Sequence, residues 1–135
     1  MSSLRPHILF ADDEATSRLL MCAALEKSGF SASLAVGGDD ALRQFRARPF
    51  DMVLLDVDMP GLDGFQVCAA LRAGIGDELP IVMVTGMHDE ESIERAYQVG
   101  ATDFIAKPYD LEVLLERIKA LLAPPAPETQ EPPII

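Results

Sequence analysis

Five short runs of apolar residues recur along the chain, and longer segments of mixed polarity separate them. Two of these runs, MVLLDV and IVMVT, are apolar at almost every position. Strands that are apolar on both sides are typical of a parallel sheet covered by helices on both faces. The five strands predicted in this way cover residues 7–11, 31–36, 51–55, 80–85 and 103–106.

The segments between and after these runs have the spacing and the end signals of helices. Gly29 and Gly100 are natural C-terminal caps, and Asp110 is a natural N-terminal cap. The five predicted helices cover residues 14–28, 39–47, 64–73, 89–99 and 110–122, the third ending before Gly74 and Gly76. Five strand–helix units in about 120 residues predict a single doubly wound α/β domain, here residues 1–122.

The end of the chain differs from this domain. Five of the 13 residues from 123 to 135 are proline, which cannot continue a helix. Two interpretations of the tail at residues 123–135 stay open: a frayed terminus, or the start of a linker to another domain.

The charge balance is acidic, because 11 Lys and Arg face 22 Asp and Glu for a net charge of −11. We therefore expect no direct binding to nucleic acid, which needs clustered Lys and Arg. We also expect no membrane span and no secretory signal, because no apolar run approaches roughly 18 residues and the N-terminus turns acidic early. Cys22 and Cys68 lie too far apart to suggest a zinc site, so we expect reduced thiols in a cytoplasmic protein.

Polar residues follow four of the five predicted strands. They are Asp12 and Asp13, Asp56, Thr85 and Lys107. Because the carboxyl ends of parallel strands meet at one edge of a sheet, we expect three carboxylates, a hydroxyl and an ammonium in one pocket. Each residue alone has an ordinary explanation, such as an Asp that caps a helix. Their joint occurrence favours a functional site.

This set of groups is suited to phosphoryl transfer. Clustered carboxylates repel one another unless a cation joins them, and oxygen ligands suit Mg²⁺ or Mn²⁺. A carboxylate can also act as a nucleophile and form an aspartyl-phosphate. A divalent cation, a lysine and a hydroxyl would each engage one oxygen of the transferred group. Asp56, which closes the run MVLLD, is the candidate acceptor.

Over about residues 6–122 the sequence resembles the receiver domains of two-component response regulators. The matching stretches are ILFADDE, AVGGDDAL, DMVLLDVDMPGLDGFQVCAALRA, IVMVTG and GATDFIAKPYDLEVLLERIKALL. The resemblance implies a flavodoxin-like fold, a five-stranded parallel sheet in the order 2-1-3-4-5 with five surrounding helices.

The resemblance also implies roles at the pocket. Asp56 matches the phosphorylated residue. Asp12 and Asp13 match the acidic pair that holds Mg²⁺, with Asp13 a direct ligand and Asp12 acting largely through water. The backbone carbonyl of Asp58 matches a third protein ligand, and Lys107 matches the lysine that pairs with the phosphoryl group.

Further matches concern a conformational switch. Thr85 matches the hydroxyl that moves to the phosphate, and Phe104 occupies the aromatic switch position, without the hydroxyl of the commoner tyrosine. The Lys107–Pro108 bond is expected to be cis. The face formed by residues 89–99, 103–106 and 110–122 is expected to change shape. We expect Ile93 and Val113 in the core, and Tyr97 and Tyr109 are candidates for exposed contacts.

By the same resemblance, a sensor histidine kinase or a histidine phosphotransfer protein supplies the phosphoryl group. The target is a downstream protein or a fused output domain, with a phosphorylation-dependent homodimer as a further state. We expect no enzyme activity beyond promotion of the protein's own phosphorylation and dephosphorylation.

Alternatives differ in chemistry. A receiver can be a binding module that is never phosphorylated. Asp56-Val57-Asp58 also resembles the DxD of haloacid-dehalogenase-type phosphatases, but their nucleophile lies on the first strand and their acidic pair comes last. A flavin-binding protein of the same sheet order is excluded, because it would have a Ser/Thr/Gly-rich phosphate loop after the first strand, whereas Ala11-Asp12-Asp13-Glu14 would repel a phosphate without a metal.

Overall fold

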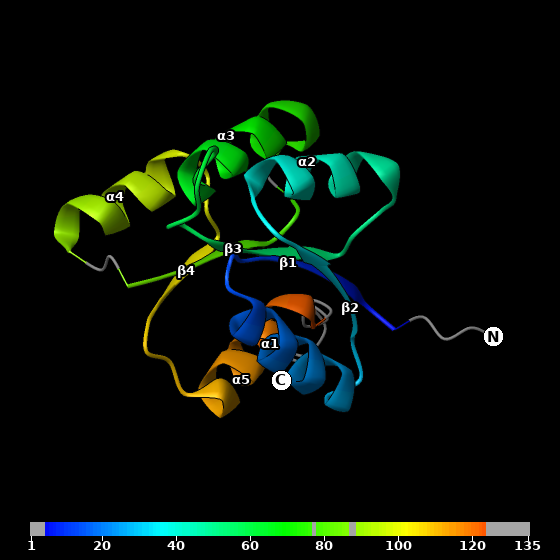
Figure 1. The fold of residues 1–135 in the computed structure, drawn as a ribbon. Helices are drawn as coiled ribbons and strands as arrows, with labels where there is room; N and C mark the ends of the chain where they lie inside the picture. The colour runs from blue at the N-terminus through cyan, green and yellow to red at the C-terminus, as the bar shows by residue number, and fades with distance from the viewer. Residues whose placement is uncertain (1–4, 77, 87–88, 124–135) are drawn as a thin grey trace, which may run out of the picture.

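The computed structural model of the chain describes residues 5–76, 78–86 and 89–123. Strands and helices alternate along it, as the apolar pattern predicts (Figure 1). The strands are β1 (His7–Ala11), β2 (Ser31–Ala35), β3 (Met52–Asp56), β4 (Ile81–Thr85) and β5 (Asp103–Ala106). The helices are α1 (Ala15–Lys27), α2 (Gly38–Ala47), α3 (Gly64–Ile75), α4 (Glu90–Gln98) and α5 (Leu111–Leu122).

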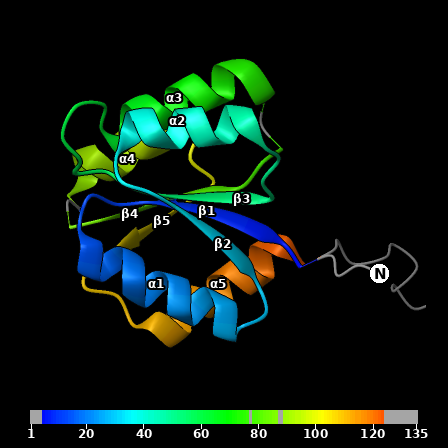
Figure 2. The same ribbon diagram turned by 45° about the vertical axis from the view of Figure 1, so that its right-hand side comes forward.

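The strands form one parallel sheet in the order β2-β1-β3-β4-β5, which confirms the predicted fold class. Helices α2, α3 and α4 cover one face, and α1 and α5 cover the other (Figures 1 and 2). The chain adds β2 on one side of β1 and the later strands on the other side. A crevice forms at such a switch point, outside the carboxyl ends of the strands.

The core is divided by the sheet into two apolar layers. Every residue of β3 and β4 is buried, and successive side chains of a strand point to opposite faces. Val53 and Leu55 therefore pack in the layer under α2 and α3, whereas Phe10 and Leu54 pack in the layer under α1 and α5. Strands held on both faces give a rigid platform for the polar residues at their ends.

The boundary of α3 differs from the prediction. The helix continues through Gly74 to Ile75 and ends at Gly76, which has a φ of +79°. A single glycine inside a helix costs only about 1 kcal/mol, so Gly74 does not end it. The left-handed backbone of Gly76 does, because L side chains rarely adopt that conformation. The other predicted elements shift by at most one residue at an end.

The prediction for Val113 is wrong. Its side chain is 55% exposed, because the buried face of α5 is formed by Leu114 and Ile118. Tyr97 is exposed, as expected, whereas Tyr109 and Ile93 are both half-buried. Both cysteines are free thiols. The tail at residues 124–135 lies outside the described part of the chain. In the described part, no helix is long and apolar enough to cross a membrane.

Candidate functional site

A cavity of about 390 Å³ opens at the edge of the sheet where the strands end, beside the switch point. We call it the acidic pocket. Its lining residues are Asp12, Asp13, Glu14, Asp56, Asp58, Gly86 and Lys107. The pocket thus collects residues at the ends of β1, β3, β4 and β5, but among the described residues the one that lines it after β4 is Gly86 and not the predicted Thr85.

Three carboxylates meet in the acidic pocket. Asp12, Asp13 and Asp56 each place an oxygen within 4.8 Å of the others. Asp12 is 1% exposed and Asp56 4% exposed, whereas Asp13 is exposed. The Oδ2 atom of Asp12 is buried and accepts no hydrogen bond from any described residue. An orphaned carboxylate oxygen beside two further carboxylates fits a hard divalent cation, which takes oxygen ligands.

Lys107 is the positive partner of these carboxylates. Its Nζ lies 3.6 Å from Asp12 Oδ2 and 3.5 Å from Asp56 Oδ2, with the side chain 30% exposed. Its backbone N–H donates to the carbonyl of Thr85 at 2.8 Å, which ties the loop after β5 to the end of β4. The Lys107–Pro108 peptide is cis, as expected.

Burial and neighbouring charges shift the pKa values of Asp56 and Lys107. Burial raises the pKa of Asp56 to about 6, and the negative charge of Asp12 adds to the rise while the Lys107 ammonium opposes it. For Lys107, burial lowers the pKa, but the carboxylates of Asp56 and Asp12 raise it by more, so the net shift is upward. Near neutral pH the pocket therefore contains an ionised Asp56 carboxylate beside a protonated Lys107 amine.

The loop after β3 holds Asp56 in place. The backbone N–H of Asp58 donates to Asp56 Oδ1 at 3.3 Å. Gly64, the first residue of α3, lies so close that an added Cβ would sit 2.7 Å from the Asp56 carbonyl oxygen. Asp63 caps the helix and forms a capping box with Gln66. The sequence Asp63-Gly64 therefore lets α3 begin directly against the strand that ends at Asp56.

The two predicted switch residues lie beside the acidic pocket. Thr85 is fully buried at the end of β4, one residue beyond the position that pairs with Asp56, but it is not among the described residues that line the cavity. Phe104 is half-buried on β5 and packs against the layer under α2 and α3. The roles of both residues stay predictions.

Two residues of the site were not identified from the sequence. Glu14 lines the cavity, and its backbone N–H donates to Asp12 Oδ1 at 2.9 Å. Arg18 donates from Nη1 to the Asp12 carbonyl oxygen at 2.8 Å. The only sequence signal for either is position, since both stand within one or two turns of the acidic pair at the start of α1.

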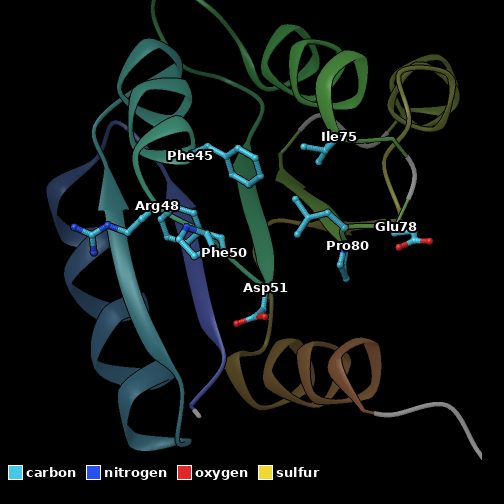
Figure 3. Close-up of a pocket in the computed structure, with 9 residues that line it drawn as sticks. Phe45, Arg48, Phe50, Asp51, Ile75, Glu78 and Pro80 are labelled. Carbon is cyan, nitrogen blue, oxygen red and sulfur yellow. The ribbon is translucent and has the colours of Figure 1, made fainter. Parts of the chain in front are cut away.

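A second cavity, of about 450 Å³, lies at the opposite edge of the sheet (Figure 3). Phe45 and Phe50 stack in it, and Arg48 and Asp51 lie on its border. Because Asp51 precedes β3 whereas Asp56 ends it, this groove lies the length of a strand from the acidic pocket and takes no part in its chemistry.

The fold and the site together define a doubly wound α/β protein with an acidic pocket that brings three carboxylates and a lysine together. Comparison with known proteins gives the family. The family model of the response regulator receiver domain matches residues 8–119. The chain therefore belongs to the receiver domains of two-component response regulators, whose members are phosphorylated on an aspartate with the help of Mg²⁺.

The curated relatives are longer proteins. The response regulator MprA of Mycobacterium tuberculosis is 40% identical over 121 residues, which cover 90% of this chain and 52% of MprA. The transcriptional regulatory protein AfsQ1 of Streptomyces coelicolor is 34% identical over 117 residues, covering 87% of this chain and 51% of AfsQ1. This chain thus spans about half the length of these relatives.

Solved structures share the fold over whole chains. The chemotaxis protein CheY4 of Vibrio cholerae is 29% identical with a TM-score of 0.83, over 87% of this chain and 99% of that one. A two-component response regulator from Clostridium difficile is 28% identical with a TM-score of 0.82, over 87% and 96%. The similarity therefore covers nearly the whole of each of these two solved chains.

Proposed function

We propose that this receiver is a phosphorylation switch whose acceptor is Asp56. The observation that carries the proposal is the position of the Asp56 carboxylate. It is buried at the end of β3, lies 3.5 Å from the Lys107 ammonium and shares the acidic pocket with two further carboxylates. A buried acid surrounded by other acids is costly for folding alone, so a functional reason for keeping it is expected.

The reaction transfers a phosphoryl group from a phosphohistidine of a partner protein. An Asp56 oxygen forms the new P–O bond in line with the breaking P–N bond, and the imidazole leaves with the electron pair and takes up a proton. Lys107 stays protonated and offsets charge on the transferred group. The cation would be Mg²⁺, held by Asp12, Asp13 and Asp56 with the Asp58 carbonyl, and it would supply charge neutralisation.

The output is proposed to leave through the face of α4, β5 and α5. The phosphorylated state draws Thr85 towards the phosphoryl group and shifts Phe104, which biases an existing equilibrium of this face. Exposed Tyr97 and Val113 on α4 and α5 are available to a partner. The partner is a downstream protein, a fused output domain or a second copy of the chain.

The phosphoryl donor is proposed to be a sensor histidine kinase or a histidine phosphotransfer protein in the cytoplasm. The relative AfsQ1 is a transcriptional regulatory protein, so control of transcription by a fused domain is one proposed output. The receiver itself is proposed to act on no other substrate and to catalyse only its own phosphorylation and dephosphorylation.

The test is the intact mass of the protein after incubation with acetyl phosphate, with Mg²⁺ or with a chelator. The expected result is a gain of one phosphoryl group in the wild type with Mg²⁺, and none in Asp56→Asn. Asp39→Asn is the matched control, because Asp39 is exposed at the start of α2. No gain in any condition, with beryllofluoride also without effect, would leave the unphosphorylated binding module as the better function.

A further inference from the structure

Asp12 is held at three points of its backbone and side chain. Its N–H donates to the Ala35 carbonyl at 3.1 Å, and its Oδ1 accepts from the Glu14 N–H at 2.9 Å. Its carbonyl oxygen accepts from Arg18 Nη1 at 2.8 Å. The remaining Oδ2 is the buried oxygen without a hydrogen bond from the described residues. The contacts thus fix Asp12 and leave Oδ2, which lies 3.6 Å from Lys107 Nζ, in the acidic pocket.

The hydrogen bond from Arg18 is the contact that acts on the peptide group after Asp12. β1 ends at Ala11, and in the described chain no backbone N–H is bonded to the Asp12 carbonyl. That carbonyl belongs to the peptide group that joins Asp12 to Asp13. A peptide group is planar, so the direction of its C=O also sets the direction of its N–H and of the next Cα. One guanidinium bond therefore orients the link between the two acidic residues.

Arg18 can hold this orientation firmly. It lies in the first half of α1, and its own N–H donates to the Glu14 carbonyl at 3.1 Å. The bond to Asp12 is part-buried and charge-assisted, which makes it stronger than a bond between neutral groups. By contrast, the Asp13 side chain is exposed and accepts no hydrogen bond from another described residue, so its direction depends on its backbone.

We propose that Arg18 is a positioning residue of the cation site: through the Asp12 carbonyl it presets the Asp12–Asp13 peptide so that both carboxylates face the bound cation. The inference rests on the proposed function, because it assumes that the acidic pocket binds a divalent cation. Residues that orient metal ligands from outside typically change metal affinity by about 10-fold to 100-fold when they are removed.

A pure charge effect would have the opposite sign. The guanidinium is a cation close to the acidic pocket, so its removal would strengthen the attraction of the carboxylates for Mg²⁺. Loss of a positioning bond would weaken Mg²⁺ binding, because both aspartates would have to be ordered by the ion itself. The direction of the change therefore distinguishes the two roles.

The test measures Mg²⁺ binding by isothermal titration calorimetry without any phosphoryl donor. Arg18→Met keeps the apolar stem of the side chain, Arg18→Ala removes it, and Arg18→Lys returns one donor. Arg48→Ala is the matched control, because it removes an exposed arginine that makes no hydrogen bond or ion pair to another described residue, at the opposite edge of the sheet. Thermal unfolding without Mg²⁺ verifies that each variant is folded.

The expected result is Mg²⁺ affinity lowered about 10-fold in Arg18→Met and Arg18→Ala, at least partly restored in Arg18→Lys and unchanged in Arg48→Ala. The N–H of Asp13 belongs to the peptide group whose carbonyl accepts the bond from Arg18. In NMR spectra of the metal-free protein, its amide resonance should therefore shift in Arg18→Met but not in Arg48→Ala. Unchanged or tighter binding in the folded Arg18 variants overturns the inference. Absence of Mg²⁺ binding in the wild type would instead overturn the cation site.

Discussion

At the scale of single residues, the buried carboxylate of Asp56 lowers the free energy of unfolding near neutral pH. Asp56 is almost completely buried, and its pKa is raised to about 6 from an ordinary value near 4. A raised pKa means that the folded state holds its proton more tightly than the unfolded state does. Between about pH 4 and pH 6 the unfolded chain loses this proton first, so stability falls as the pH rises, and above that range the loss is complete.

Replacement of Asp56 by Asn is therefore expected to stabilise the metal-free protein. At pH 7 the gain is on the order of 2 kcal/mol, because the variant buries no charge. Denaturant unfolding in a chelator at pH 4, 5, 6 and 7 measures it. The difference between wild type and variant should grow through this range. Asp39→Asn, at an exposed site, controls for the change of residue type. A difference that stays constant with pH would show that burial of the charge is not the cause.

At the scale of elements, α3 meets the acceptor strand without room for a side chain. An added Cβ on Gly64 would lie 2.7 Å from the Asp56 carbonyl oxygen and 2.8 Å from Val57 Cα, and backbone atoms cannot move aside cheaply. Gly74 lies in the same helix and has nothing within 4 Å of an added Cβ. Alanine substitutions at the two glycines therefore distinguish the effect of close packing, tested at Gly64, from the effect of helix propensity, tested at Gly74.

Gly64→Ala is expected to lower the free energy of unfolding by about 1–3 kcal/mol and to slow phosphorylation, because α3 or the end of β3 has to shift. Gly74→Ala is expected to raise the free energy of unfolding by about 0.5–1 kcal/mol, because alanine is the better helix former. Urea unfolding and the rate of mass gain with acetyl phosphate measure both effects. Equal stabilities of the two variants would contradict the close packing at Gly64.

The far end of α3 also holds the connection between α4 and β5. Arg72 donates to the carbonyls of Gly100 and Gly76 at 2.8 and 3.0 Å, and to the Thr102 hydroxyl oxygen at 3.2 Å. Cys68 donates from Sγ to the Val99 carbonyl at 3.4 Å. These contacts fix the C-terminal end of α4 to the body of the domain.

Arg72→Ala is expected to lower the free energy of unfolding by about 2 kcal/mol, because it removes several hydrogen bonds that each contribute about 1 kcal/mol to stability. Amide hydrogen exchange should speed up at residues 99–102 while the centre of the sheet stays protected. Arg43→Ala is the control, because it removes an exposed arginine whose one ion pair among the described residues is with Asp40 on α2. If the two variants have equal stability, the contacts of Arg72 contribute little.

At the scale of the whole molecule, the pattern of apolar runs predicts all five strands and all five helices, because strands buried on both faces leave a plain signal. The order of the strands comes only from the family resemblance, since periodicity does not report which strands pair. Strand-end logic brings Asp12, Asp13, Asp56 and Lys107 together correctly. It misses Arg18, whose partner is a backbone carbonyl and therefore has no residue type to signal it.

The contacts of α4 indicate how a conformational change that begins at Asp56 should reach this helix. Its C-terminal end is held by Arg72 and Cys68, whereas its N-terminal end follows Gly86, which lines the acidic pocket. A change at Asp56 that draws Thr85 inward is therefore expected to act first on the N-terminal end of the helix, which comes soon after Thr85 in the chain. The expected motion is a tilt about the anchored end, in place of a shift of the whole helix.

Amide hydrogen exchange with beryllofluoride and Mg²⁺, which together stand in for the phosphoryl group, tests this tilt. Exchange should change most in the first turn of α4, at residues 90–94, and in β5, and least at residues 98–101, with α2 unaffected. Asp56→Asn should show no change under the same conditions. A uniform response along α4, or an equal response of α2, would contradict the anchored end. In Arg72→Ala the response should extend to residues 98–101, because the anchor that confines it is gone.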